Sequence, residues 1–170
     1  KGIETDKKIE NFTIGRDREL DLYLAPFDVM GTMAHSTMLA EVDLLTQSEL
    51  RALLPELKTL YQNARSGNFE IEEGVEDVHS QVEMELTRKL GDIGKKVHSG
   101  RSRNDQVLLD LKLFAREKIM EVVQASNLLF DALQEKSEAH KDTLLPGYTH
   151  LQVAMPSSFG LWFGAYAESL

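Results

Sequence analysis

Apolar residues recur along most of the chain at the three- and four-residue spacing that is typical of amphipathic helices. This spacing predicts one helix over residues 27–42, a second from about 47 to 64 and a third from about 77 to 90. A fourth stretch, from about 104 to 139, keeps helical spacing without a break, which makes a rod of roughly 50 Å. No stretch shows the alternation of a strand, so we expect an all-α protein.

Local signals place several helix ends. Thr46 and Glu49 have the spacing of a capping box, in which each side chain can bond to the backbone of the other residue. Pro55 lies within the same helix and removes one backbone donor, which predicts a kink or a later start. Ser66-Gly67 is a plausible stop, and Asp77 is the expected N-cap of the third helix.

A helix of more than 30 residues survives by packing against neighbours in a bundle, and one rod cannot form that bundle alone. We therefore expect a small helical domain over residues 1–100, and the start of a central helical bundle over residues 101–170. Residues 91–100 contain too many glycines for regular structure. The last residues predict a helix that begins near Pro156, and we expect a fragment of a longer protein.

Composition narrows the function classes. Lys and Arg total 19 against 28 Asp and Glu, a formal charge of −9, which makes nucleic acid and anionic membranes poor partners. The absence of cysteine excludes a disulfide framework and thiol catalysis. No apolar stretch approaches the roughly 20 residues of a membrane span, and no signal-peptide core is present, so a cytoplasmic location is expected.

A basic segment stands out against this negative charge. Lys95, Lys96, Arg101 and Arg103 lie within nine residues, directly before Asn104 at the start of the predicted rod. A helix N-terminus favours an anion, and arginine can bind a carboxylate through two parallel hydrogen bonds. Two interpretations remain open from charge alone: a carboxylate-binding site, or a capped helix whose arginines pair with surface acids.

A second candidate lies at residues 146–152, PGYTHLQ, in a short connection after the rod. His150 has the side chain best suited to proton transfer near neutral pH. Thr149 can donate a hydrogen bond to a substrate carboxylate, and Gln152 could add another donor. A single loop histidine is also often structural, so both roles remain open for His150.

The other histidines carry weaker signals. His79 follows Asp77 at the start of a predicted helix, where either residue could face a polar pocket or simply cap the helix. His35 is expected in the core or an interface, and His140 ends the rod without an assigned function. No pair of histidines or carboxylates has convincing metal-ligand spacing, so no metal is expected.

Four sequence segments resemble the argininosuccinate lyase family of the fumarase/aspartase superfamily. HSGRSRNDQ at 98–106 and LLPGYTHLQVAMPSS at 144–158 are highly specific to it. EDVHS at 76–80 and DVMGTMAHSTML at 28–39 agree with it in order and spacing. The resemblance covers the whole chain, as the N-terminal third or so of such an enzyme.

The resemblance implies a helical homotetramer that splits argininosuccinate reversibly into arginine and fumarate, in arginine biosynthesis or the urea cycle. It implies no metal and no organic cofactor. Each active site would be assembled from three subunits, and the general base would be a serine in a GSS-x-MP-x-K-x-N loop. That loop is absent from this sequence, so the chain by itself is expected to be inactive.

The resemblance also assigns residues. His150 would help proton transfer, as an acid or an orienting group, with Thr149 beside it. The substrate-binding residues would be Ser102, Arg103, Asn104, Asp77, His79, Gln152, Thr13 and Asp17. Thr13 and Asp17 are the best match to an early Ser-x-x-x-Asp contact of the family.

Two departures and two rival functions accompany this interpretation. The family's opening WGGRF segment is missing, and Pro55 interrupts a helix that the family keeps regular. Another lyase of the superfamily, such as adenylosuccinate lyase or fumarase, is disfavoured by the Ser-Arg-Asn-Asp run. A non-enzymatic, crystallin-like protein on the same fold would keep most motif residues and stays an alternative.

Overall fold

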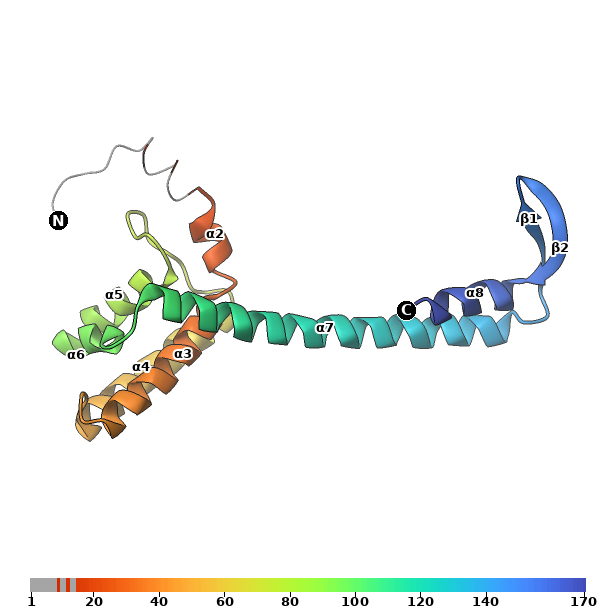
Figure 1. Cartoon of the computed structure of the whole chain (residues 1–170). Helices are drawn as coiled ribbons and strands as arrows, with labels where there is room; N and C mark the ends of the chain where they lie inside the picture. Colours follow the sequence, from red (N-terminus) through yellow and green to blue (C-terminus); the bar gives the residue numbers. More distant parts are fainter. Residues whose placement is uncertain (1–8, 10–11, 13–14) are drawn as a thin grey trace. The chain divides into compact units, whose positions relative to one another are not determined.

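The structure is a computed structural model that describes Ile9, Phe12 and residues 15–170 (Figure 1). It confirms the mainly helical fold. The chain divides into two compact units, residues 1–115 and 116–170. The long helix α7 (Arg103–Ala139) begins in the first unit and ends in the second. The domain boundary expected near residue 100 stays a prediction.

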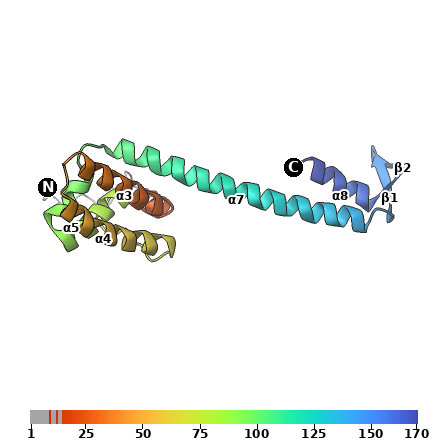
Figure 2. The same ribbon diagram turned by 90° about the horizontal axis from the view of Figure 1, so that it is seen from below.

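The first unit is built of helices, and α3 and α4 lie side by side within it (Figures 1 and 2). Its elements are α2 (Asp17–Asp21), α3 (Ala25–Glu41), α4 (Gln47–Arg65), α5 (Val78–Leu90), α6 (Asp92–Lys95), the 3-10 helix η1 (Lys96–His98) and the first turns of α7. The predicted helices are therefore present, with ends close to those expected. Among the described residues, no helix combines the length and apolar character needed to cross a bilayer.

The helix α4 shows how local sequence sets an element. The Thr46 hydroxyl accepts a hydrogen bond from the backbone N–H of Glu49, and the Glu49 carboxylate accepts one from the backbone N–H of Thr46. This capping box starts the helix directly after Thr46, so the later start considered because of Pro55 is wrong. The helix continues through Pro55 and ends before Ser66, as predicted.

The core of the first unit forms where α3, α4 and α5 meet. Leu53 and Leu57 of α4 are fully buried, as is Leu39 of α3, and all three belong to one apolar cluster with Val82 and Leu86 of α5. Burying a side chain of this size stabilises the fold by about 1.5–3 kcal/mol. The apolar stripe on α4 is therefore the main anchor of the unit.

The prediction of irregular structure over residues 91–100 is wrong. Gly91 ends α5 as expected, with φ of 63°, but α6 and η1 follow it. Val97 is buried, and Ile93 packs against the same core cluster. Burial of these apolar side chains overrides the weak helix preference of the glycines.

The second unit contains a hairpin that the sequence pattern did not predict. The strands β1 (Leu144–Thr149) and β2 (Gln152–Ser158) pair antiparallel, with a register irregularity at Gly147/Tyr148. Pro156 lies in β2 rather than in a helix; α8 (Phe159–Glu168) begins after Ser158, whose hydroxyl accepts a hydrogen bond from the Leu161 N–H. Most hairpin residues are exposed on both faces, so no apolar–polar alternation marked the strands.

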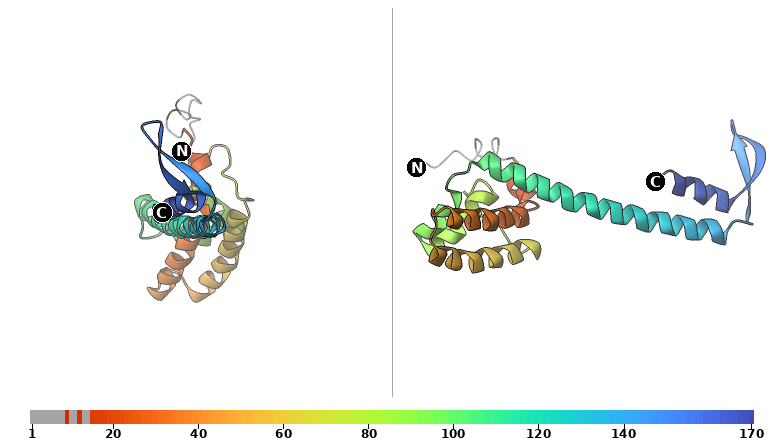
Figure 3. Two further views of the ribbon diagram at one scale, coloured as in Figure 1. Left: turned by 90° about the vertical axis from the view of Figure 1, so that its right-hand side faces the viewer. Right: turned by 60° about the horizontal axis from the view of Figure 1, so that its bottom comes forward.

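The helix α8 runs beside the end of α7 (Figure 3). The Ser137 hydroxyl donates a hydrogen bond of 2.8 Å to the Gly160 carbonyl, and the Gly160 N–H donates to the His140 carbonyl. The two backbones approach closely: a Cβ on Gly160 would lie 2.5 Å from Lys141 Cα. Only glycine fits at this contact.

Gly160→Ala is therefore expected to lower the unfolding free energy of the second unit by about 1–3 kcal/mol, the usual cost of overpacking. Trp162 is the single tryptophan of the sequence and lies on α8, so its fluorescence during urea unfolding reports this unit. Gly164→Ala is the matched control on the same helix, because its Cβ would lie 3.3 Å from the Ser137 hydroxyl, a small group that can rotate. Equal losses in the two variants would contradict the prediction.

Candidate active site

The first candidate region lies where the start of α7 meets the start of α5. Arg103 Nη1 lies 2.8 Å from Asp77 Oδ2 and 3.1 Å from Glu76 Oε2, and Arg103 Nη2 donates to the Ser80 hydroxyl at 2.9 Å. Asp77 also caps α5 by accepting a hydrogen bond from the Ser80 N–H. Two residues predicted from separate segments, Asp77 and Arg103, are thus brought into direct contact.

The two sequence neighbours of Arg103, Ser102 and Asn104, have different surroundings. The Ser102 N–H donates to Asp105 Oδ2 at 2.7 Å, and the Ser102 hydroxyl accepts a longer bond from the Asp105 N–H. Asn104 is exposed in the first turn of α7. Arg103 lines a cavity of 460 Å³ together with Ser80, Lys95 and four other residues. A small anion can therefore approach Arg103 from solvent.

All four cations of the basic segment have partners within the chain. Lys95 pairs with Asp92, Lys96 with Glu49, and Arg103 with Asp77 and Glu76. Arg101 points into the interior and donates to the Thr32 hydroxyl at 2.8 Å. Arg103 therefore pairs with acids, as one of the two interpretations expects, whereas Arg101 bonds to Thr32. Arg103 also keeps 46% of its side chain exposed, so it can still take a ligand.

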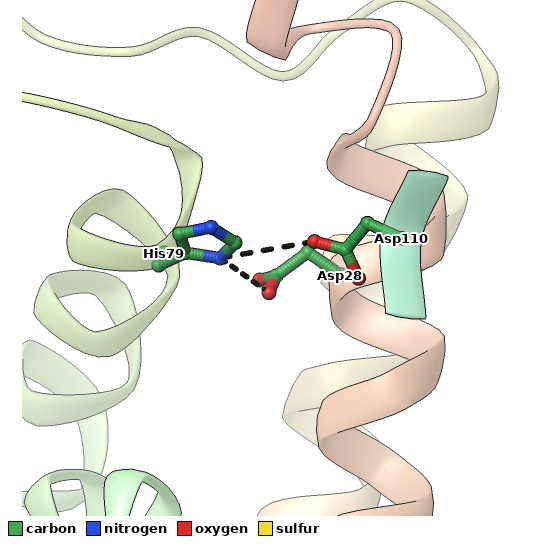
Figure 4. Close-up of side chains that lie close together, drawn as sticks. All are labelled: Asp28, His79 and Asp110. Carbon is green, nitrogen blue, oxygen red and sulfur yellow. Dashed lines mark hydrogen bonds and ion pairs between the residues drawn. The ribbon is translucent and has the colours of Figure 1, made fainter. Parts of the chain in front are cut away.

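His79 lies in a buried cluster with two carboxylates (Figure 4). Its Nδ1 atom is 2.7 Å from Asp28 Oδ1 and 3.9 Å from Asp110 Oδ2. Asp28 comes from α3, His79 from α5 and Asp110 from α7. Asp28 and Asp110 are each 1% exposed, and sequence reasoning missed both. The one available signal was a charged residue inside an apolar helical stretch, VLLDLKLF for Asp110.

Further polar groups surround these three side chains. Gln106 donates to Asp28 Oδ1 at 3.2 Å, and the carboxylate of Asp21 accepts from the Val78 N–H nearby. Within the described part of the chain, four buried polar atoms of this region have no hydrogen-bond partner: Asp28 Oδ2, Asp110 Oδ2, Gln106 Oε1 and Arg101 Nε. Buried polar atoms normally have hydrogen-bond partners, so four unpaired atoms make this region unusual for a protein interior.

Burial and charge shift the titration of the cluster. Burial, together with the charge of Asp28, raises the pKa of Asp110 to about 7. Burial works against a charged His79, but the hydrogen bond and charge of Asp28 raise the pKa of His79 above its usual value. Burial lowers the pKa of Arg101, a group that nevertheless stays protonated. Asp110 therefore exchanges its proton near neutral pH, beside Asp28, His79 and Arg101.

One nitrogen and two oxygen ligand atoms of this cluster lie within 4.8 Å of one another, a donor set that could in principle hold a metal ion. Arg101 already supplies positive charge to both carboxylates. A divalent cation would have to compete with that guanidinium. The geometry therefore favours a proton-sharing cluster over a metal centre.

The second candidate region is the tip of the hairpin in the second unit. Thr149 pairs with Gln152, and His150 and Leu151 form the two-residue turn between them. Both turn residues have positive φ, 49° and 63°, as a type I′ turn requires. Such turns normally use Asn and Gly, so His150 and Leu151 hold a strained conformation. The turn leaves His150 exposed at the end of a paired element.

The early predicted contact is only partly described. Asp17 is exposed in the first turn of α2, and Thr13 lies outside the described residues. The structure thus brings Asp77 and Arg103 together, with Ser102 and Asn104 adjacent in sequence. It places His79 in the interior beside them, and Thr149, His150 and Gln152 together at the hairpin tip.

Known proteins are similar in sequence to this chain over its whole length. A family of lyases matches residues 1–170. An argininosuccinate lyase of Bacteroides fragilis is 68% identical over the whole chain, and one of Stenotrophomonas maltophilia is 40% identical over 99% of it. The chain spans 38% and 39% of the length of these two relatives.

Solved structures show the same fold. An EDDS lyase variant with bound fumarate matches 99% of this chain and 33% of its own, with a TM-score of 0.71 and 26% identity. A β-carboxy-cis,cis-muconate cycloisomerase of Acinetobacter calcoaceticus matches 86% of this chain and 35% of its own. Its TM-score of 0.66 at 18% identity supports the fold alone.

The raised pKa of Asp110 makes stability depend on pH. The folded chain keeps this proton up to about pH 7, whereas the unfolded chain loses it near 3.8, so folding binds a proton between these values. Stability from this group is therefore lost as the pH rises through that window. Asp110→Asn cannot lose this proton, so it should remove most of the fall in stability between pH 4 and 8 that comes from this group.

Urea unfolding followed by circular dichroism across this pH range measures the effect. Asp131→Asn, on an exposed residue of the same helix, is the control and should follow the parent chain. If the parent and Asp110→Asn chains show the same pH dependence, Asp110 does not hold a proton in the fold.

Proposed function

Since this chain belongs to the lyase family, we propose that it works as part of an argininosuccinate lyase, which splits argininosuccinate reversibly into arginine and fumarate. The proposal includes a homotetramer with active sites shared between subunits, and a cytoplasmic location. The 68% identity to a protein named argininosuccinate lyase supports it, and so do the two candidate regions.

The reaction is an elimination. A base removes a proton from the carbon beside one carboxylate of the substrate, and the electron pair moves into that carboxylate as an enediolate. Return of the pair forms the carbon–carbon double bond of fumarate and breaks the bond to nitrogen, which takes up a proton as arginine leaves. Negative charge therefore grows on the carboxylate in the transition state, and fixed donors around it lower the barrier.

Arg103 and Asn104 are suited to bind that carboxylate. Asp77, only 15% exposed, holds one edge of the Arg103 guanidinium at 2.8 Å, while nearly half of the arginine side chain remains open to solvent. Arg103 and Asn104 belong to the first turn of the 37-residue helix α7, where the helix dipole favours an anion. Ser102 lies next to this turn as a further donor.

His150 and Thr149 are suited to the proton transfers. The hairpin presents the His150 imidazole in an exposed turn, with Thr149 and Gln152 paired directly behind it. Strained backbone conformations of this kind are concentrated at functional sites. His150 would deliver the proton to the leaving nitrogen or orient the group that does so.

Association of subunits is supported by the surface of α7. Between residues 119 and 130 this helix carries exposed apolar side chains, among them Ile119, Val122 and Leu129, each at least 50% exposed. A long helix with such a face requires partners in water. A bundle of several chains would cover it.

The observation that carries the proposal is the 2.8 Å contact between Asp77 and Arg103. These residues come from two motifs, EDVHS and GRSRNDQ, which are separated in sequence and resemble the same family. Their contact makes a fixed, half-exposed guanidinium at a helix N-terminus, which is the group that the elimination needs.

A chimera tests the proposal on this chain. Residues 1–170 replace the matching 38% of the Bacteroides fragilis relative, and turnover of argininosuccinate is followed by fumarate absorbance. We expect the chimera to be active and the 170-residue chain alone to be inactive. His150→Asn in the chimera should lower kcat by about 10²- to 10⁴-fold, the usual contribution of a general acid or base.

His140→Gln is the matched control, because His140 lies in the same unit and contacts the Phe163 ring without a proposed role in the reaction. It should leave kcat within about threefold. A chimera that assembles like the relative but does not turn over argininosuccinate would favour the crystallin-like alternative. Activity on adenylosuccinate or fumarate alone would favour another lyase of the superfamily.

A further inference from the structure

The buried cluster of Asp28, His79, Arg101 and Asp110 is directly connected to the candidate carboxylate site. His79 follows Asp77 by two residues, and Arg101 precedes Arg103 by two residues. Each residue of the Asp77–Arg103 contact thus has a cluster residue two positions away in sequence. Two peptide units separate each of these two cluster residues from its partner in the site.

Hydrogen bonds in the cluster join three elements. Asp28 of α3 is bonded to His79 of α5 at 2.7 Å and to Gln106 of α7 at 3.2 Å. Arg101, in the segment that leads into α7, donates to Thr32 of α3 at 2.8 Å. The helix α3 therefore holds both segments that carry the site residues, although it contributes none of them itself.

Side chains of α3 and α7 meet at the level of Asp110. Gly31 lies one turn after Asp28, and a Cβ on it would lie 2.9 Å from Leu109 Cδ2 and 3.8 Å from Asp110 Oδ1. The small residue allows α7 to approach α3 at this level. Asp110 then lies beside Asp28, and both carboxylates face the same His79 nitrogen, Nδ1 (Figure 4).

The two buried carboxylates of the cluster require compensating positive charge or protons. Two carboxylates, each 1% exposed, face one guanidinium and one imidazole, and one oxygen of each carboxylate has no hydrogen-bond partner in the described residues. Burying unpaired charge is costly, so the cluster is stable only when a proton or a cation compensates each acid. Such an arrangement has few alternative geometries.

We propose that this cluster fixes the start of α7 against α5, and that Asp110 is a positioning residue which acts on the substrate through Arg103. This inference rests on the proposed function. Enzymes lose about 10²-fold in rate when a binding group moves by about 1 Å, so a rigid support for Arg103 has a direct effect on turnover. His79, a suggested substrate contact, then acts from the interior.

The groups that face Asp110 determine how pH acts on this support. They are Asp28 from α3, His79 from α5, Arg101 from the segment before α7 and Asp21 from α2. When Asp110 loses its proton, a second buried negative charge appears beside Asp28. Repulsion between these acids loosens the junction, so the position of Arg103 becomes less fixed as the pH rises above neutrality.

The active chimera provides the first test, with two variants at Asp110. Asp110→Ala should lower kcat/KM by about 10- to 100-fold, because the support is removed. Asp110→Asn keeps the shape of the protonated acid, so it should stay within about threefold of the parent at pH 7. It should also move the alkaline fall of kcat/KM to higher pH, an effect that a loss of packing would not produce.

Asp131→Ala, an exposed acid on the same helix, is the control and should match the parent. Thermal unfolding of each variant confirms that the assay temperature lies below its transition. If Asp110→Ala does not fold, the pH profile of Asp110→Asn alone decides. Unchanged kcat/KM in folded Asp110→Ala, or an unchanged pH profile in Asp110→Asn, would overturn the inference.

A second test does not depend on activity. In the 170-residue chain, the Ser80 N–H is bonded to Asp77 and the Gln106 N–H to Ser102, so their hydrogen exchange reports the two halves of the site. Asp110→Ala should speed both exchanges at least about tenfold, and Asp110→Asn should not. An inactive parent chimera with this exchange result would contradict only the proposed function; equal exchange rates would contradict the positioning role.

Discussion

The arrangement of the first unit depends on the hydrogen bond between the buried Asp28 carboxylate and the His79 imidazole. This 2.7 Å contact joins α3 to α5, and Gln106 extends it to α7. An apolar core can hold helices together while they slide by small amounts, whereas buried polar groups accept only geometries that satisfy them. The core provides most of the stability of the unit, and the polar cluster restricts its helices to one register.

Local signals in the sequence predicted most of the helical fold. The capping box at Thr46, the Asp77 cap and the Gly91 stop act within a few residues, so they can be recognised without knowing the fold. The hairpin was missed because its strands are exposed on both faces and contain Pro146 and Pro156, which face each other in the register. Its formation depends on a turn at His150 and Leu151 that the usual Asn-Gly signal does not mark.

The candidate site was predictable only in its exposed part. Asp77 and Arg103 belong to motifs with a recognisable resemblance, and their contact follows once α5 and α7 are packed. Asp28 and Asp110 give no comparable signal, because a single acid in a helix usually faces solvent. Their burial results from the meeting of three helices, which is a property of the packed unit and not of any one segment.

The two arginines of the Arg101-Ser102-Arg103 segment show how the structure separates support from binding. They have the same charge and lie two residues apart, yet Arg101 is turned inward to Thr32 while Arg103 is turned outward to Asp77 and the cavity. The inward guanidinium of Arg101 places positive charge beside the buried acids. The outward guanidinium of Arg103 binds a ligand well only if its backbone is held still. Arg101 therefore supports the segment from the interior, and Arg103 gives the same segment an accessible binding group.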